Sequence, residues 1–272
     1  MFWTRLASGV VLLAIAIGTM SLGGIPLAVL LWAASLVAFR ELTKALKCTL
    51  DGKINGLEII GFLGITGYYL LLYVSGEPVW LMMCVMGMFL ACMFAYVLTF
   101  PKFHASQVMA AVFSYIYAPV LLSFVYLTRM CPQGIYTVWM ILISSWGCDT
   151  CAYAVGKLIG RKKIFPVLSP KKSLEGCIGG VAGSALIGWL YGFFFVEKAL
   201  PDQRAAWMIA VICGVGAVMS MVGDLAASAI KRNVEIKDYG KLIPGHGGIM
   251  DRFDSMIVTA PMTYFLTVLM LM

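Results

Sequence analysis

Long apolar runs separated by short polar stretches constrain this chain more than any other feature. A helix needs about 20 mainly apolar residues to cross a bilayer. Nine runs approach or exceed that length, near residues 5–20, 24–40, 57–75, 78–100, 107–128, 134–158, 176–196, 206–230 and 255–272. Because the chain is 61% hydrophobic and only 12% charged, a soluble fold of 272 residues could not bury this much apolar surface. We therefore predict an all-α, polytopic membrane helix bundle with about nine transmembrane helices.

The first run, which contains Arg5, also has the appearance of the apolar part of a signal peptide. No convincing small-residue cleavage site precedes the second run, so we interpret the first as a membrane helix. The two runs are joined by the short segment 21–24, which predicts a tight hairpin.

Lysine and arginine positions predict the orientation in the membrane. With the N-terminus in the cytoplasm and nine alternating spans, 17 of the 20 basic residues fall on the cytoplasmic side. The exceptions are Arg129, Lys198 and Arg204. Cytoplasmic loops of membrane proteins carry such an excess of positive charge. The same bias explains the net charge of +7 without a nucleic-acid partner.

Polar residues are distributed unevenly between the two halves of the chain. We interpret residues 1–272 as one membrane domain, in which 1–130 form hydrophobic N-terminal helices and 131–272 carry the catalytic helices and cytoplasmic loops. No inverted repeat of the kind found in transporters is visible. The eight cysteines show no disulfide or zinc spacing, and the pair Cys148 and Cys151 lies in an apolar run, so we expect them to be packing residues.

Two carboxylates, Asp149 and Asp224, lie inside predicted spans. Ionisable groups at membrane depth are costly and are functional candidates, although a structural ion pair within the bundle is the alternative interpretation. At helical spacing, Asp224 shares a face with Ser228, Lys231 and Arg232. That face would carry a carboxylate, a hydroxyl and two cations toward the cytoplasm.

Asp251 and Asp254 lie at the predicted start of the last span. Carboxylates there can serve simply to stabilise the positive end of the helix. The functional alternative is metal ligation, because carboxylate oxygens suit Mg²⁺, which usually takes one or two protein ligands and completes its shell with water and phosphate. Asp224 and Asp251 come from two segments that could converge on one ion.

Two loops have the composition of phosphate-binding segments. Gly245, Gly247 and Gly248 surround His246, and glycines allow the backbone to approach a ligand closely. Lys171, Lys172 and Ser173 immediately precede a predicted helix, where anions are favoured. A solvated positive-inside loop is the simpler interpretation for Arg161, Lys162 and Lys163.

The polar residues of 140–256 resemble those of a known family, the phosphatidate cytidylyltransferases or CDP-diacylglycerol synthases. The resemblance rests on Ser228, Lys231, Arg232, Lys237, Asp238, Gly240, the stretch 244–248, Asp251, Arg252 and Asp254. It also rests on Asp149, Thr150, Ala152, Tyr153, Gly156, the stretch 169–173, Glu175 and Gly176. The first half of the chain matches only in being hydrophobic.

The resemblance implies that the chain is an Mg²⁺-dependent nucleotidyltransferase, which transfers CMP from CTP to phosphatidate. Asp224 and Asp251 would hold a metal pair, with Asp149 and Asp254 as additional or supporting ligands. Lys171, Lys172, Ser173, Lys231, Arg232 and Lys237 would bind phosphates. Ser228, Asp238 and Arg252 would contact substrate, and Gly245, His246, Gly247 and Gly248 would shape the nucleotide pocket. The expected location is the bacterial inner membrane, with membrane lipids as partners and a homodimer left open.

Two other functions use similar residues. A transporter for an anionic solute would also need buried carboxylates and cationic loops, but the first five spans are sparse in polar residues and provide no continuous polar path. A CTP-dependent lipid-alcohol kinase would use the same nucleotide and metal but transfer the terminal phosphate.

Overall fold

The computed structural model describes residues 2–49, 52–199, 204–242 and 247–272. Across these ranges the chain is helical and contains no strand, apart from an isolated antiparallel bridge between Lys163 and Ser173. The helices of the N-terminal part are α1 (Phe2–Leu22), α2 (Gly24–Ala45), α3 (Gly56–Val74), α4 (Pro78–Leu98), α5 (Ala105–Tyr115), η1 (Ile116–Val120) and α6 (Leu121–Met130). They are followed by α7 (Gly134–Thr137), α8 (Trp139–Leu142), η2 (Ile143–Gly147), α9 (Cys148–Ile159), α10 (Leu174–Tyr191), η3 (Gly192–Val196), α11 (Ala205–Asn233) and α12 (Met250–Leu271).

These elements confirm the predicted all-α membrane fold. Within the described residues, eight helical segments are long and apolar enough to cross a membrane, and Gly9–Leu22 adds a shorter apolar helix. Three spans are continuous across short irregular turns: Ala105–Met130, Gly134–Ile159 and Leu174–Val196. The last helix begins at Met250 rather than near 255. It starts earlier because side-chain carboxylates accept its first backbone amides.

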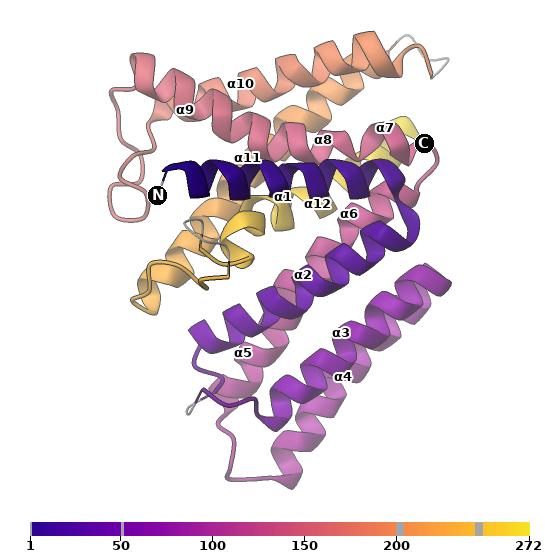
Figure 1. Cartoon of the computed structure of the whole chain (residues 1–272), viewed down its shortest axis with the longest axis vertical. Coiled ribbons are helices and arrows are strands. Elements are labelled where there is room, and N and C mark those ends of the chain that lie inside the picture. The colour runs from indigo at the N-terminus through magenta and orange to yellow at the C-terminus, as the bar shows by residue number, and fades with distance from the viewer. Residues whose placement is uncertain (1, 50–51, 200–203, 243–246) are drawn as a thin grey trace. The chain divides into compact units, whose positions relative to one another are not determined.

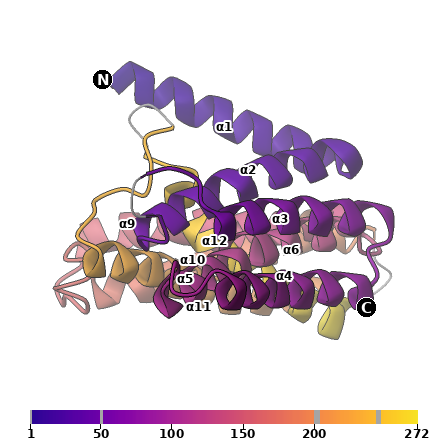
Figure 2. The ribbon, with the colours of Figure 1, turned by 90° about the horizontal axis from the view of Figure 1, so that it is seen from below.

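The chain divides into two compact units. The first unit contains Met1–Tyr126 and Val234–Arg252, and the second contains Leu127–Asn233 and Phe253–Met272. In the first unit, α3 packs against α2 and α4 (Figures 1 and 2). In the second unit, α10 packs against both α9 and α11 (Figure 1). The segment between α11 and α12 thus belongs to the same unit as the first five spans.

Small residues at every fourth position let α10 approach its two neighbours closely. Gly176, Gly180, Ser184, Gly188 and Gly192 are all buried. A Cβ atom on Gly180 would lie 3.0 Å from the Cys148 sulfur on α9, and one on Gly192 would lie 2.6 Å from the Ala206 Cα on α11. Close backbone packing of this type replaces the hydrophobic driving force that is missing between helices in lipid.

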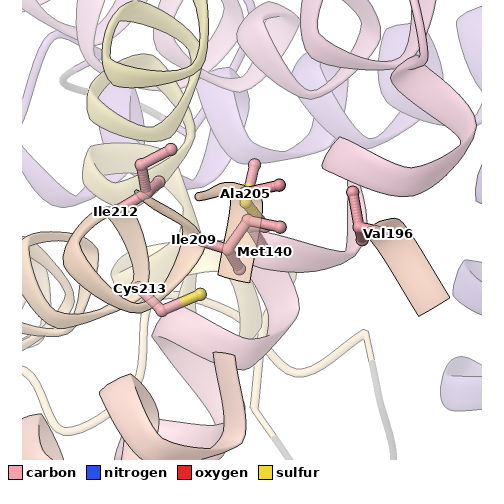
Figure 3. Close-up of a cluster of buried hydrophobic side chains, with 6 residues drawn as sticks. All are labelled: Met140, Val196, Ala205, Ile209, Ile212 and Cys213. Carbon is pink, nitrogen blue, oxygen red and sulfur yellow. The ribbon is translucent and has the colours of Figure 1, made fainter. Parts of the chain in front are cut away.

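An apolar cluster holds the other end of the second unit together. Its members come from α8, η3 and α11 (Figure 3): Met140, Val196, Ala205, Ile209, Ile212 and Cys213. Each of these side chains is at most 1% exposed. The cluster therefore packs α8, η3 and α11 together.

A polar network fixes the connection between α2 and α3 in the first unit. Arg40 forms an ion pair with the buried carboxylate of Glu58, which also accepts a hydrogen bond from Thr43 at 2.7 Å. Gln107 donates from Nε2 to the Cys48 carbonyl at 2.8 Å, and Asn55 donates to the same carbonyl at 2.9 Å. Arg40, which the sequence indicated only as a positive-inside cation, thus also has a structural partner.

Candidate functional site

The predicted site residues divide between the two compact units. The second unit holds Asp149, Lys171, Lys172, Ser173, Asp224, Ser228, Lys231, Arg232 and Asp254. The first unit holds Lys237, Asp238, Gly247, Gly248, Asp251 and Arg252. Gly245 and His246 lie outside the described residues. Convergence of Asp224 with Asp251 on one ion stays a prediction.

An ion pair lies at the centre of the second unit's group. Lys172 Nζ lies 2.5 Å from Asp224 Oδ2, and the side chains are 20% and 29% exposed. Asp149, in the first turn of α9, and Asp254, in the first turns of α12, are both close enough to Asp224 to interact with it electrostatically. Three carboxylates from three helices and one lysine therefore share one region of the second unit.

Gly223, which has no side chain, allows α11 and α12 to approach each other beside these carboxylates. A Cβ atom on Gly223 would lie only 2.7 Å from the Asp254 carbonyl oxygen and 3.1 Å from the Val258 side chain. A glycine is therefore required at this crossing. Because Gly223 immediately precedes Asp224, the close approach of the helices also sets the separation of Asp224 from Asp254.

The loop 160–173 carries Lys171 and Lys172, and hydrogen bonds hold its two ends together. Glu175 accepts hydrogen bonds from the backbone amides of Arg161 at 3.0 Å and Lys162 at 3.3 Å. Lys163 Nζ donates to the Lys171 carbonyl at 2.9 Å, across the antiparallel bridge. Glu175, for which the sequence suggested no separate role, thus fixes the loop that carries the lysines.

Ser173 caps α10 as well as facing the site. Its hydroxyl oxygen accepts the Gly176 amide at 3.2 Å, and the residue is 2% exposed. Cβ atoms on Gly156 and Gly160 would approach the same oxygen at 3.2 and 2.5 Å. Since a hydroxyl has one donor and two acceptor positions, capping leaves it the chemistry to contact a phosphate.

A cavity of about 400 Å³ opens beside the ion pair, entirely within the second unit. Its walls come from α9, the 160–173 loop, the start of α10 and α11: Asp149, Ala152, Tyr153, Gly156, Lys157, Lys163, Ser169, Lys171, Lys172, Ser173, Gly176, Cys177 and Met221. One wall is therefore cationic and another bears a carboxylate. The two cysteines of the C-x-x-C pair do not line this cavity. Cys148 contacts the Ala217 carbonyl, and Cys151 packs against Gly183.

The polar face predicted on the eighth span lies on a single helix. Asp224, Ser228, Lys231 and Arg232 all belong to α11, which continues to Asn233. Lys231 is close enough to Asp254 to interact with it electrostatically, and Arg232 is exposed. The two cations of α11 therefore differ in environment: Lys231 lies near a carboxylate, and Arg232 is exposed to solvent.

In the first unit, Asp251 is held by its own loop. Its Oδ2 atom accepts hydrogen bonds from the backbone amides of Tyr239 at 2.8 Å and Gly248 at 3.0 Å. Gly247 has a φ of 83°, a conformation that favours glycine, and a Cβ there would lie 2.9 Å from the same oxygen. Lys237, Asp238 and Arg252 are exposed on this unit.

Glu41 is the residue of this region that the sequence interpretation missed. It lies on α2, is 8% exposed, and accepts the backbone amides of Ile249 at 3.2 Å and Met250 at 2.8 Å. A signal was present, since Glu41 lies one residue beyond the predicted end of the second apolar run, close to a region in which ionisable groups are costly. Its neighbour Arg40 made it look like part of an ordinary polar boundary.

The carboxylates suit a hard divalent cation. Oxygen ligands are what Mg²⁺ prefers, and it binds through one or two carboxylates together with substrate phosphates rather than in an all-protein cage. In the part of the chain that the structure describes, no group of three or more His, Cys, Asp or Glu side chains forms such a cage. A magnesium site built from Asp149, Asp224 and Asp254 together with a phosphate ligand stays a prediction.

The fold and the site together define a polytopic membrane protein whose second unit brings lysines and carboxylates together beside a cavity. Comparison with known proteins gives the family: the model of the cytidylyltransferase family matches residues 3–270. The chain belongs to that family. The match includes the first half of the chain, which contains none of the motifs on which the resemblance rested.

Several curated relatives bear the name phosphatidate cytidylyltransferase. One from Staphylococcus saprophyticus is 35% identical over 54% of this chain and 55% of the relative. One from Synechocystis is 39% identical over 52% of this chain and 46% of the relative. In these two comparisons the chain spans about half the length of the protein it matches. One from Staphylococcus aureus is 28% identical over 90% of this chain and 91% of the relative.

Proposed function

We propose that this protein is a phosphatidate cytidylyltransferase, which converts CTP and phosphatidate into CDP-diacylglycerol and pyrophosphate. The observation that carries the proposal is the Lys172–Asp224 pair beside a cavity of about 400 Å³ with a cationic wall. Membership of the cytidylyltransferase family supports the nucleotide, and the names of the relatives support the lipid.

The chemistry requires two anions to meet. An oxygen of the phosphatidate phosphate attacks the α-phosphorus of CTP, and the bond from that phosphorus to the bridging oxygen breaks as pyrophosphate leaves in line. The attacking oxygen is already anionic near neutral pH, so no strong general base is needed. Charge neutralisation and alignment are therefore the protein's main contributions.

Each group of the second unit has a part in this scheme. Lys171 and Lys172 reach the cavity from a loop whose base is fixed, and would bind phosphates of the nucleotide or lipid. Ser173 would add a hydroxyl contact at the start of α10. On α11, Ser228, Lys231 and Arg232 would provide further contacts for phosphate anions toward solvent.

The remaining proposed residues belong to the first unit. Asp251 would act with Asp224 as a metal ligand, and Asp149 and Asp254 would support them. Lys237, Asp238 and Arg252 would contact substrate beside the glycines at 245, 247 and 248 and His246. When bound, Mg²⁺ would neutralise phosphate charge and polarise the α-phosphoryl group.

A membrane site of this kind can receive both substrates. We place it at the cytoplasmic face of a bacterial plasma (inner) membrane, because most basic residues would face that side. CTP would arrive from water, and phosphatidate would arrive from the bilayer with its headgroup at the interface. Basic loops would also attract anionic membrane lipids. A homodimer is compatible with this arrangement.

Pyrophosphate release tests the proposal. Detergent-solubilised protein with CTP, Mg²⁺ and phosphatidate should release pyrophosphate only when all three are present, and Asp224→Asn should lose the activity. If a lipid alcohol is added as an alternative acceptor, its phosphorylation together with conversion of CTP to CDP would instead establish the kinase. A folded, lipid-supplemented preparation that consumes no nucleotide would contradict both enzymes and favour transport.

A further inference from the structure

Glu41 joins the first half of the chain to the glycine-rich segment that precedes α12. It is 208 residues from Ile249 and 209 from Met250 in sequence, yet one carboxylate oxygen accepts each of their amides. All of these residues belong to the first unit. The first amides of a helix have no partner within the helix, so Glu41 acts as a cap supplied by another helix.

Two glycines make room for this contact. A Cβ atom on Gly240 would lie 2.0 Å from Glu41 Oε1, and one on Gly248 would lie 2.4 Å from both carboxylate oxygens. Backbone therefore approaches the carboxylate from two sides where any side chain would displace it. The glycines at these two positions are explained by Glu41 without reference to a ligand.

The cap bears directly on Asp251. Glu41 holds the amides of Ile249 and Met250, and Asp251 holds the amide of Gly248. Three consecutive amides are thus fixed by two carboxylates immediately before the proposed metal ligand.

We propose that Glu41 is a positioning residue for the proposed metal site: it acts through the backbone of 249–250 to hold Asp251 in place for the divalent cation. The proposal rests on the proposed function, since it takes Asp251 as a ligand. It also gives the first five spans a role in the reaction besides packing, because α2 carries the residue that orders the last helix. Partners that orient a ligand typically change metal affinity or activity by about 10- to 100-fold when removed.

The test compares two variants that each remove a helix cap from the same unit. Glu41→Gln replaces one acceptor oxygen with an NH₂ group that faces a backbone amide. Asn55→Ala removes the cap of α3, where the Asn55 side chain accepts the Glu58 amide at 3.0 Å. Both lose one or two hydrogen bonds at a helix start, but only Glu41→Gln touches the segment before Asp251.

Two readouts are needed, and the first does not depend on activity. Hydrogen exchange of the peptide spanning 247–252 should accelerate in Glu41→Gln and stay at the wild-type rate in Asn55→Ala. The Mg²⁺ concentration that half-activates CMP transfer should rise about tenfold or more in Glu41→Gln. In Asn55→Ala it should be unchanged, even if that variant is less stable.

The outcomes separate this inference from the proposed function. Unchanged exchange at 247–252 in Glu41→Gln would overturn the cap itself. Faster exchange with a wild-type Mg²⁺ requirement would overturn the positioning role and leave Glu41 a structural cap. Wild-type protein that shows no Mg²⁺-dependent transfer would overturn the proposed function and the positioning role with it, while exchange would still decide the cap.

A mutant cycle provides a second check on the geometry. Gly240→Ala places a methyl group against the Glu41 carboxylate, so it should accelerate exchange at 247–252 much as Glu41→Ala does. The two changes together should produce less than the sum of their separate effects, because they disturb one contact. Additive effects would show that the two residues act independently and would contradict the proposed contact.

Discussion

Lys172 Nζ and Asp224 Oδ2 lie 2.5 Å apart, although Lys172 is on the 160–173 loop and Asp224 is 52 residues further along the chain, on α11. Both side chains keep some solvent access, so the pair should contribute little to folding stability, about 0–1 kcal/mol. Because Lys172 lines the cavity, we propose that the pair serves substrate binding instead. Stability and activity should therefore respond differently when the pair is broken.

Lys172→Met should leave the melting temperature nearly unchanged and slow CMP transfer by about 10- to 100-fold, the loss of a charged hydrogen bond to a phosphate. Initial rates at saturating and limiting CTP would measure it. Lys162→Met is the matched control, because Lys162 lies on the same loop and its described contacts are through the backbone. Equal activity in the two variants would contradict the assignment of Lys172.

Gly223→Ala should reduce activity by about 10- to 100-fold, since a shift of about 1 Å in reacting groups can cost that much. The added methyl group would meet the Asp254 carbonyl and push α11 from α12 beside Asp224. Specific activity should be measured per folded molecule. Gly192→Ala, which disturbs the α10–α11 contact, provides a comparison that should lose stability but retain activity per folded molecule.

Gly192→Ala should itself lower stability by about 1–3 kcal/mol, the usual cost of overpacking. A Cβ there would lie 2.6 Å from the backbone of Ala206, which cannot move aside like a flexible side chain. Thermal unfolding in detergent would measure the change. Gly214→Ala on α11 adds only an ordinary contact at 3.5 Å, and it should match the wild type. A Gly192→Ala protein as stable as Gly214→Ala would argue against the close packing of α10.

Cys48 should resist alkylation in the folded protein. Burial raises the pKa of its thiol to about 11, so the thiolate is scarce at neutral pH. The pKa of Cys48 is higher in the folded protein than in the unfolded chain. The protonated thiol therefore contributes fully to folding stability below about pH 8.5, and this contribution is lost as the pH rises toward 11. Maleimide labelling of a variant whose only cysteine is Cys48 would measure this, before and after denaturation. Rapid labelling of the folded protein at pH 7 would contradict the burial of Cys48 in the connection between α2 and α3.

Chelation should stop the reaction without unfolding the protein. EDTA should abolish CMP transfer and added Mg²⁺ should restore it, because carboxylates rather than a closed cage would hold the ion. The melting temperature should change little on chelation when substrates are absent. Full turnover in EDTA would remove the metal from the account.

The spans could be predicted because lipid imposes both a length and a composition on them. The grouping of Asp224 with Lys231 followed in the same way from helical spacing. Glu41 and Ile249 could not be paired, because nothing in a single sequence links residues 208 positions apart. The role of Glu175 in fixing the 160–173 loop could not be predicted either, since its partners are backbone amides, which almost every residue has.

The most direct test of the central claim follows labelled phosphate from CTP into lipid. Purified protein would be incubated with phosphatidate, Mg²⁺ and CTP labelled at either the α- or the γ-phosphate, and the lipid would then be extracted. Cytidylyl transfer predicts that the α-label enters the lipid and the γ-label leaves as pyrophosphate. Gamma label in an added lipid alcohol, with none of the α-label in lipid, would contradict the account.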